Sequence, residues 1–248
     1  MPLIFRDYAD DMAISVAARS PQRVLEIAAG TGVLTRALAA VLPANVDVVA
    51  TDLNPAMIDE AKAVGTTRPV DWRAADAMRL PFPDQSFDVV VIQFGAMFFP
   101  DKPAAYAEAR RVLRASGALM FNVWDRIEAN EVADAVTAGL ATFFPSDPPR
   151  FLARMPYGYF DRATLENDLT AGGFTRKPSI ETVMFRGRAN TASDASIAFC
   201  QGTPLRGEIE ARGSLEHATA AGAAEVARRF GAGPIDTKIQ AHVVTVEK

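Results

Sequence analysis

The chain has 248 residues, 49% of them apolar, which is enough to bury one full hydrophobic core. Its net charge of −4 gives no basic field that would attract nucleic acid or an acidic membrane surface, and the single cysteine, Cys200, excludes an internal disulfide. No apolar run reaches the roughly 20 residues of a membrane-spanning helix, and the N-terminus lacks the pattern of a secretory signal. We therefore expect a cytoplasmic protein without a nucleic-acid partner.

Strands and helices alternate along the first half of the sequence. Apolar runs predict strands at 24–28, 46–52, 70–74, 87–94 and 118–124, and helical spacing marks 31–42, 55–64 and 102–114. Asn54 is placed to cap the second helix, with Pro55 at its first position, and Ser116-Gly117 is expected to end the third. The alternation predicts an α/β fold, a Rossmann-like doubly wound sheet of about seven mostly parallel strands.

The second half is richer in helices. Helical patterns occur at about 128–144, 163–171, 194–200 and 214–230, and strand-like alternation returns at 180–186 and 239–246. Because no repeat or composition break appears, we expect a single domain, with a core at 1–125 and helical substrate-side insertions at 126–160 and 190–235, after the fifth and sixth strands. The apolar residues scattered through the second half are compatible with a homodimer interface.

A glycine-rich turn follows the first strand. In "VLEIAAGTGVLTRALAAVL", Gly30 and Gly32 remove the Cβ atoms that would block a ligand from the backbone N–H groups at the start of the helix. Asp52 ends the second strand, where a carboxylate accepts hydrogen bonds from ribose hydroxyls in this class of sheet. Both dinucleotide enzymes and enzymes that use S-adenosylmethionine share this pair of features.

Two details favour S-adenosylmethionine. Thr35 stands where the dinucleotide fingerprint G-x-G-x-x-G has its third glycine. Asp76 lies at the start of the loop after the third strand, where its carboxylate can accept a hydrogen bond from the adenine amino group. The sequence thus favours an adenosine ligand other than NAD.

Four segments in order resemble the motifs of class I S-adenosylmethionine-dependent methyltransferases: "LEIAAGTG", "ATDLNPAMI", "AADAMRLPFPDQSFDVVVIQF" and "EARRVLRASGALMFNVW". Within that class they are similar to the type-11 group, which is related to the C-methyltransferases of the ubiquinone and menaquinone pathways. The likeness covers roughly 24–124 and carries little information about the acceptor.

The resemblance assigns ten positions to a cofactor site. Those bordering the aminocarboxypropyl arm would be Glu26, Ala28, Gly30 and Gly32. Those at the adenosine would be Asp52 for the ribose, Leu53 against the adenine face, and Asp76 and Ala77 at the adenine edge. Gln93 and Phe94 would close the pocket after the fourth strand, and "IFRDYADDM" would supply a covering helix with Tyr8 as a contact.

No catalytic base and no metal site are predicted. The methyl of a sulfonium is already activated, so transfer needs in-line placement of the acceptor and exclusion of water. His217 and His242 are interpreted as structural. Trp124, Tyr157 and Tyr159 line either an acceptor pocket or an ordinary lid core.

The leading hypothesis is a methyltransferase that acts on a small, apolar or aromatic molecule by direct in-line transfer. An NAD-dependent oxidoreductase is the alternative, against which stand the missing third glycine and the absence of a Tyr-x-x-x-Lys pair, since Arg110 lies four places after Tyr106. A non-catalytic protein that binds S-adenosylmethionine or S-adenosylhomocysteine is a third. "DPPR" at 147–150 differs from the D-P-P-Y of nucleic-acid amino-methyltransferases in its place and its last residue.

Overall fold

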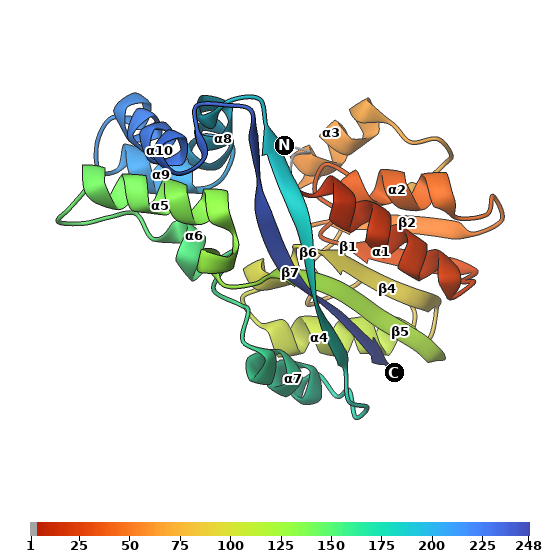
Figure 1. Ribbon diagram of the computed structural model, residues 1–248. Helices are drawn as coiled ribbons and strands as arrows, with labels where there is room; N and C mark the ends of the chain where they lie inside the picture. The colour runs from red at the N-terminus through yellow and green to blue at the C-terminus, as the bar shows by residue number, and fades with distance from the viewer. Residues whose placement is uncertain (1–3) are drawn as a thin grey trace. The chain divides into compact units, whose positions relative to one another are not determined.

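The computed structural model describes residues 4–248, which form two compact units (Figure 1). The sheet unit comprises 5–123, 161–181 and 242–248, and the helical unit comprises residue 4, 124–160 and 182–241. No helix within residues 4–248 is long and apolar enough to cross a membrane. The single domain with two insertions, expected from the sequence, stays a prediction.

Seven strands form one sheet in the order β3-β2-β1-β4-β5-β7-β6. Their bounds are β1 Arg23–Ile27, β2 Asp47–Asp52, β3 Asp71–Ala74, β4 Phe87–Gln93, β5 Leu113–Trp124, β6 Ser179–Ala189 and β7 Ile235–Glu247. The pairs β1–β2, β1–β4, β2–β3 and β4–β5 are all parallel. This confirms the Rossmann-like sheet of seven mostly parallel strands.

Helices cover both faces of the sheet within the sheet unit. Helices α1 (Arg6–Ala18) and α2 (Val33–Val41) pack together over one face, as Figure 1 shows, and share an apolar core with β1, β2, β4 and Met120 of β5. The next residue of β5, Phe121, points to the opposite face, where its ring stacks on Tyr106 of α4 (Lys102–Val112) at 5.3 Å. Helix α7 (Arg162–Ala171) packs beside α4.

The expected end of the third helix at Ser116-Gly117 is wrong. Helix α4 ends at Val112, and β5 begins at Leu113, which pairs with Phe87. The next pairing joins Val89 to Ala118, so residues 114–117 form a bulge at the start of the strand. Pairing with β4 therefore ends the helix earlier than Ser116-Gly117 would. Arg114, which was predicted to be helical, lies in β5.

The predicted start of the helix at 55–64 is confirmed. Helix α3 spans Pro55–Val64, as predicted, and the Asn54 side chain accepts a hydrogen bond from the backbone N–H of Ala56 at 3.0 Å. A short 3-10 turn, η1 (Ala96–Phe98), follows β4.

The helical unit is built around α10. Its elements are the 3-10 turn η2 Ile127–Ala129, α5 Glu131–Phe143, α6 Phe151–Arg154, α8 Ala192–Cys200, α9 Leu205–Glu210 and α10 Leu215–Phe230. A Cβ on Gly139 of α5 would lie 2.9 Å from the Cα of Gly222 in α10, so the two helices approach backbone to backbone. On the other side of α10, the Ser196 hydroxyl of α8 donates to the Thr219 carbonyl at 2.8 Å.

The continuous helix expected at 128–144 is interrupted at Asn130. This side chain is 1% exposed, and its amide donates to the carbonyls of Asp125, Arg126 and Gln240. Its Oδ1 accepts from the backbone N–H of Gln240 at 3.0 Å. These bonds to β7 and to the preceding loop separate η2 from α5.

Candidate functional site

The turn after β1 is held in the left-handed region at three positions. The φ angle is +55° at Ala28, +55° at Gly30 and +80° at Gly32. A Cβ at Gly32 would come within 2.8 Å of the Trp72 ring, so this position requires glycine for space as well as for φ. A Cβ at Gly30 would meet no atom within 4 Å. The backbone at Gly30 therefore borders open space, in which a ligand can lie against it.

Asp52 connects the end of β2 to this turn. Its Oδ2 accepts a hydrogen bond from the Gly30 N–H at 2.8 Å, and its Oδ1 accepts one from the Asn54 N–H at 2.8 Å. Because each carboxylate oxygen can accept two hydrogen bonds, both keep an acceptor site for a ligand hydroxyl. The next side chain, Leu53, is 71% exposed, which makes it an apolar surface at the same edge of the sheet.

Asp76 forms a tight turn just after β3. Its Oδ1 accepts from the Met78 N–H at 2.9 Å, and its backbone carbonyl accepts from the Arg79 N–H at 3.0 Å. Ala77, between them, is buried. The side chain therefore caps its own loop, and its Oδ2 makes no hydrogen bond with any residue from 4 to 248.

Glu26 is a carboxyl group buried inside β1. It is 1% exposed, and its Oε2 accepts a hydrogen bond from the Thr35 hydroxyl at 2.5 Å. Burial raises the pKa of Glu26 to about 8, although the Thr35 bond and the charge of Arg36 act in the opposite direction. This carboxyl is therefore protonated at neutral pH, and a cation bound beside it would favour its ionised form.

Gln93 and Phe94 hold the start of α1 against the end of β4. The Gln93 side-chain amide donates to the Phe5 carbonyl at 2.9 Å. The Phe94 ring contacts the rings of Phe5 at 5.5 Å and Tyr8 at 5.2 Å, and its N–H donates to the Asn122 Oδ1 at 3.0 Å. The covering helix expected from the N-terminal segment is present as α1, with Tyr8 fully buried.

All ten predicted cofactor positions lie in the sheet unit, at or just beyond the carboxyl ends of β1, β2, β3 and β4. These four strands are neighbours in the sheet, which is where ligands bind in open α/β folds. A direct hydrogen bond joins Asp52 to Gly30. Fit to an adenosine ligand is supported by the open space at Gly30 and by the two remaining acceptor sites of Asp52.

The two histidines belong to α10 and β7, neither of which supplies a predicted cofactor position. His217 is exposed in the first turn of α10, where its N–H donates to the Ser214 hydroxyl at 3.3 Å. His242 is 5% exposed in β7. No three His, Cys, Asp or Glu side chains gather as a metal-binding group in the described part of the chain.

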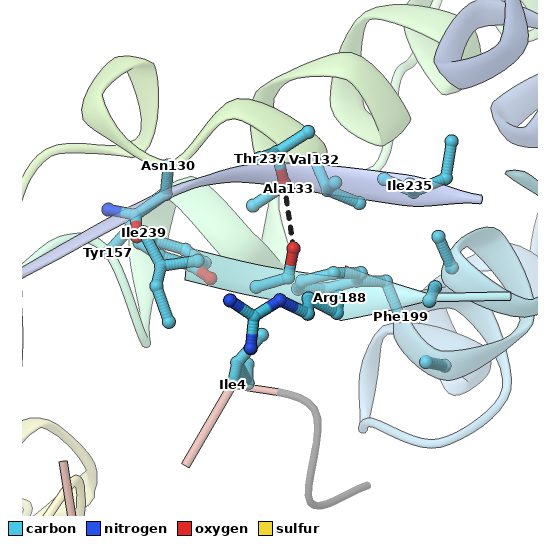
Figure 2. Close-up of a pocket in the computed structure, with 14 residues that line it drawn as sticks. Ile4, Asn130, Val132, Ala133, Tyr157, Arg188, Phe199, Ile235, Thr237 and Ile239 are labelled. Carbon is cyan, nitrogen blue, oxygen red and sulfur yellow. Dashed lines mark hydrogen bonds between the residues drawn. The ribbon is translucent and has the colours of Figure 1, made fainter. Parts of the chain in front are cut away.

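The helical unit contains a cavity lined by one of the three predicted aromatic residues. Trp124, Tyr157 and Tyr159 are all buried, and the rings of Trp124 and Tyr157 lie 5.8 Å apart. Only Tyr157 of these three lines the cavity (Figure 2). Most of the other lining residues were not predicted from the sequence, including Asn130, Val132, Phe199, Ile235, Thr237 and Ile239. Alternation over 235–239 was the available signal, since it places three of them on one face of a strand.

The chain is similar in sequence to known methyltransferases. Residues 25–121 match the model of a family described as a methyltransferase domain. The ubiquinone/menaquinone biosynthesis C-methyltransferase UbiE of Pseudomonas aeruginosa is 33% identical over 171 residues, which are 64% of this chain and 67% of that protein.

Two solved structures share the fold over nearly the whole chain. The YcgJ protein of Bacillus subtilis covers 98% of both chains at 20% identity and a TM-score of 0.61. A SAM-dependent methyltransferase of Thermotoga maritima covers 98% of this chain and 90% of its own, at 15% identity and a TM-score of 0.56. On the sequence match to UbiE and the family model, this chain belongs to the S-adenosylmethionine-dependent methyltransferases, with S-adenosylmethionine as its cofactor.

Proposed function

We propose that this methyltransferase binds its cofactor at the carboxyl edge of β1–β4 and transfers the methyl group to a small, uncharged, apolar or aromatic acceptor. The observation that carries the site is the Asp52 carboxylate, which is fixed by two backbone N–H groups beside the open space at Gly30. There it receives the two ribose hydroxyls. The remaining contacts with the cofactor are those that the family resemblance implies.

Two groups of residues bind the two ends of the cofactor. Around the adenosine, Leu53 packs on the ring, and Asp76 with Ala77 binds the ring edge. Asp76 keeps one carboxylate oxygen for this contact while the other closes its own turn. Around the aminocarboxypropyl arm lie Glu26 and the backbone of Ala28, Gly30 and Gly32, and Gln93 and Phe94 close the site below α1.

S-adenosylmethionine supplies a methyl group that is already activated on a sulfonium. The protein therefore contributes placement and the exclusion of water, and no residue needs to act as a general base unless the acceptor is protonated at the attacking atom. The aromatic contacts of Phe94 with Phe5 and Tyr8 give the site an apolar cover of its own. Both histidines stay outside this scheme.

An uncharged acceptor is supported by the helical unit, whose cavity has a largely aliphatic and aromatic lining. The C-methyltransferases to which the chain is similar act, by their name, in ubiquinone and menaquinone biosynthesis. For this chain we propose an acceptor that is neutral and mostly hydrocarbon.

Calorimetric titration with S-adenosylmethionine, S-adenosylhomocysteine and NAD tests the site. We expect micromolar binding of the two sulfur ligands, no binding of NAD, and loss of at least tenfold in affinity on Asp52→Ala, because two charge-assisted hydrogen bonds to the ribose disappear. Asp47→Ala is the matched control, since Asp47 is exposed at the opposite end of the same strand. Equal losses in both variants, or binding of NAD alone, would refute the assignment.

The same samples test two finer points. Light scattering after size exclusion measures whether the protein is the homodimer that the sequence suggested. Transfer of a labelled methyl group to neutral aromatic compounds, compared with acidic and basic ones, measures the acceptor class. Turnover confined to charged acceptors would contradict the proposal while leaving the cofactor site intact.

A further inference from the structure

The cavity of the helical unit has a built, asymmetric interior. It lies between the strands β6 and β7 and the helices α5 and α8 (Figure 2). Val132, Phe199, Ile235 and Ile239 supply an apolar lining, and alanines of α5 and α8 leave room between them. A lining of this kind favours a compact apolar group over a charged one.

Three of the four polar side chains in the lining are already engaged elsewhere. The amide of Asn130 is saturated by backbone groups, with three carbonyls as acceptors and the Gln240 N–H as donor. The Thr237 hydroxyl donates across to a carbonyl of β6 at 3.5 Å, the dashed line of Figure 2. The Arg188 side chain is 65% exposed and pairs with Asp236 at 3.3 Å. Each of these three side chains thus has at least one partner within the protein.

Tyr157 is the fourth polar side chain, and it is different. It is 3% exposed, its ring packs against Trp124, and Figure 2 places it at the Ile239 end of the cavity. Among residues 4–248, no hydrogen bond to its hydroxyl is found. Burial alone raises the pKa of Tyr157, so the hydroxyl stays neutral and keeps its proton to donate. A buried donor without a partner costs free energy, which a ligand oxygen would recover.

We propose that this cavity is a binding site for a compact, uncharged ring or branched hydrocarbon that carries one carbonyl or hydroxyl oxygen, and that the Tyr157 hydroxyl donates a hydrogen bond to that oxygen. The apolar lining binds the hydrocarbon part, and Tyr157 selects the oxygen-bearing molecule over its hydrocarbon analogue. That this ligand is the methyl acceptor rests on the proposed function, whereas the binding site itself does not.

Phenol and toluene test the site, because they match in size and differ in a hydroxyl against a methyl group. Binding is followed without methyl donor from the ¹³C-labelled δ1-methyl signals of Ile235 and Ile239. We expect phenol to shift both signals saturably. Tyr157→Phe removes only the hydroxyl and should weaken phenol binding roughly three- to tenfold while leaving toluene binding unchanged or tighter.

Two further variants keep the result decisive. Tyr106→Phe removes a buried tyrosine hydroxyl from the sheet unit and should leave phenol binding as in the wild type. Ala198→Leu places a larger side chain in the lining and should weaken binding of both probes. Circular dichroism establishes that each variant is folded.

Three results would overturn the proposal: no saturable shift with phenol, equal phenol affinity in Tyr157→Phe and wild type, or shifts that persist unchanged in a folded Ala198→Leu. A titration of the same samples with S-adenosylmethionine separates the two claims. Donor binding without phenol binding refutes the cavity site alone, and phenol binding without donor binding refutes the proposed function alone.

Discussion

The buried carboxyl of Glu26 makes the stability of this protein depend on pH in an unusual direction. Its pKa rises from 4.5 to about 8 on folding, because burial removes the carboxylate from water. The folded state therefore holds a proton that the unfolded state releases above pH 4.5. The stabilisation associated with this proton is complete below pH 4.5 and is lost as the pH rises towards 8.

The size of the effect follows from the shift. Each pH unit inside this window lowers the free energy of unfolding by about 1.4 kcal/mol, so the loss between about pH 5 and pH 8 is about 3 to 4 kcal/mol. Glu26→Gln removes the ionisation and keeps the shape of the side chain. Wild type should lose this much stability relative to Glu26→Gln across the window, because contributions from all other groups cancel in the difference.

Urea denaturation at a series of pH values measures the difference. Glu60→Gln, which changes an exposed carboxyl on α3, is the control and should follow the wild-type curve. Parallel curves for wild type and Glu26→Gln would refute the reasoning, since they would mean that Glu26 has the same pKa in both states.

Cofactor binding provides a second measurement of the same proton. If the cationic arm of S-adenosylmethionine lies beside Glu26, binding near pH 7 should ionise the carboxyl and release close to one proton. Titrations in phosphate and in Tris buffer, which differ in ionisation enthalpy, measure the number released. Glu26→Gln should release none, and an equal release by both proteins would remove Glu26 from the arm site.

Four other substitutions test the packing within each unit. Gly32→Ala should lower the free energy of unfolding, measured by urea titration, by about 2 to 4 kcal/mol, because it combines a left-handed φ with a Cβ 2.8 Å from Trp72. Gly30→Ala should cost about half as much, because no atom lies within 4 Å of its Cβ. Gly139→Ala should lower stability by about 1 to 3 kcal/mol, because its Cβ would press on the backbone of α10 at 2.6 Å; an unchanged denaturation midpoint would contradict that packing. Asn130→Ala should cost about 2 to 4 kcal/mol because it leaves several buried backbone groups without partners, and faster amide exchange in β7 would locate the loss there.

Much of the sheet unit was predictable because its signals are local. The cap at Asn54 and the proline that follows it set the start of α3 within four consecutive residues. The glycine turn is equally local, since left-handed φ angles such as those at Gly30 and Gly32 favour glycine. The apolar runs of β1, β2 and β4 identified buried parallel strands directly.

The sequence did not reveal where competition between elements decides the outcome. Helix α4 stops at Val112 because Leu113 pairs with Phe87, a partner 26 positions earlier, and the local signal at Gly117 is overruled. The break at Asn130 depends on Gln240, which lies 110 positions later. Neither interaction can be predicted from the residues next to it in the sequence.

By itself, the sequence determined the class of fold and the strand–helix alternation, because both follow from short-range periodicity. Its resemblance to a family predicted the residues of the cofactor site. Tertiary structure alone decided that Glu26 is protonated, since its pKa depends on burial beneath α2 and on the Thr35 hydroxyl. It also decided that Tyr157 faces a cavity, whose walls come from segments as far apart as Asn130 and Ile239. Burial and cavity shape are properties of packed segments, and only the folded chain brings those segments together.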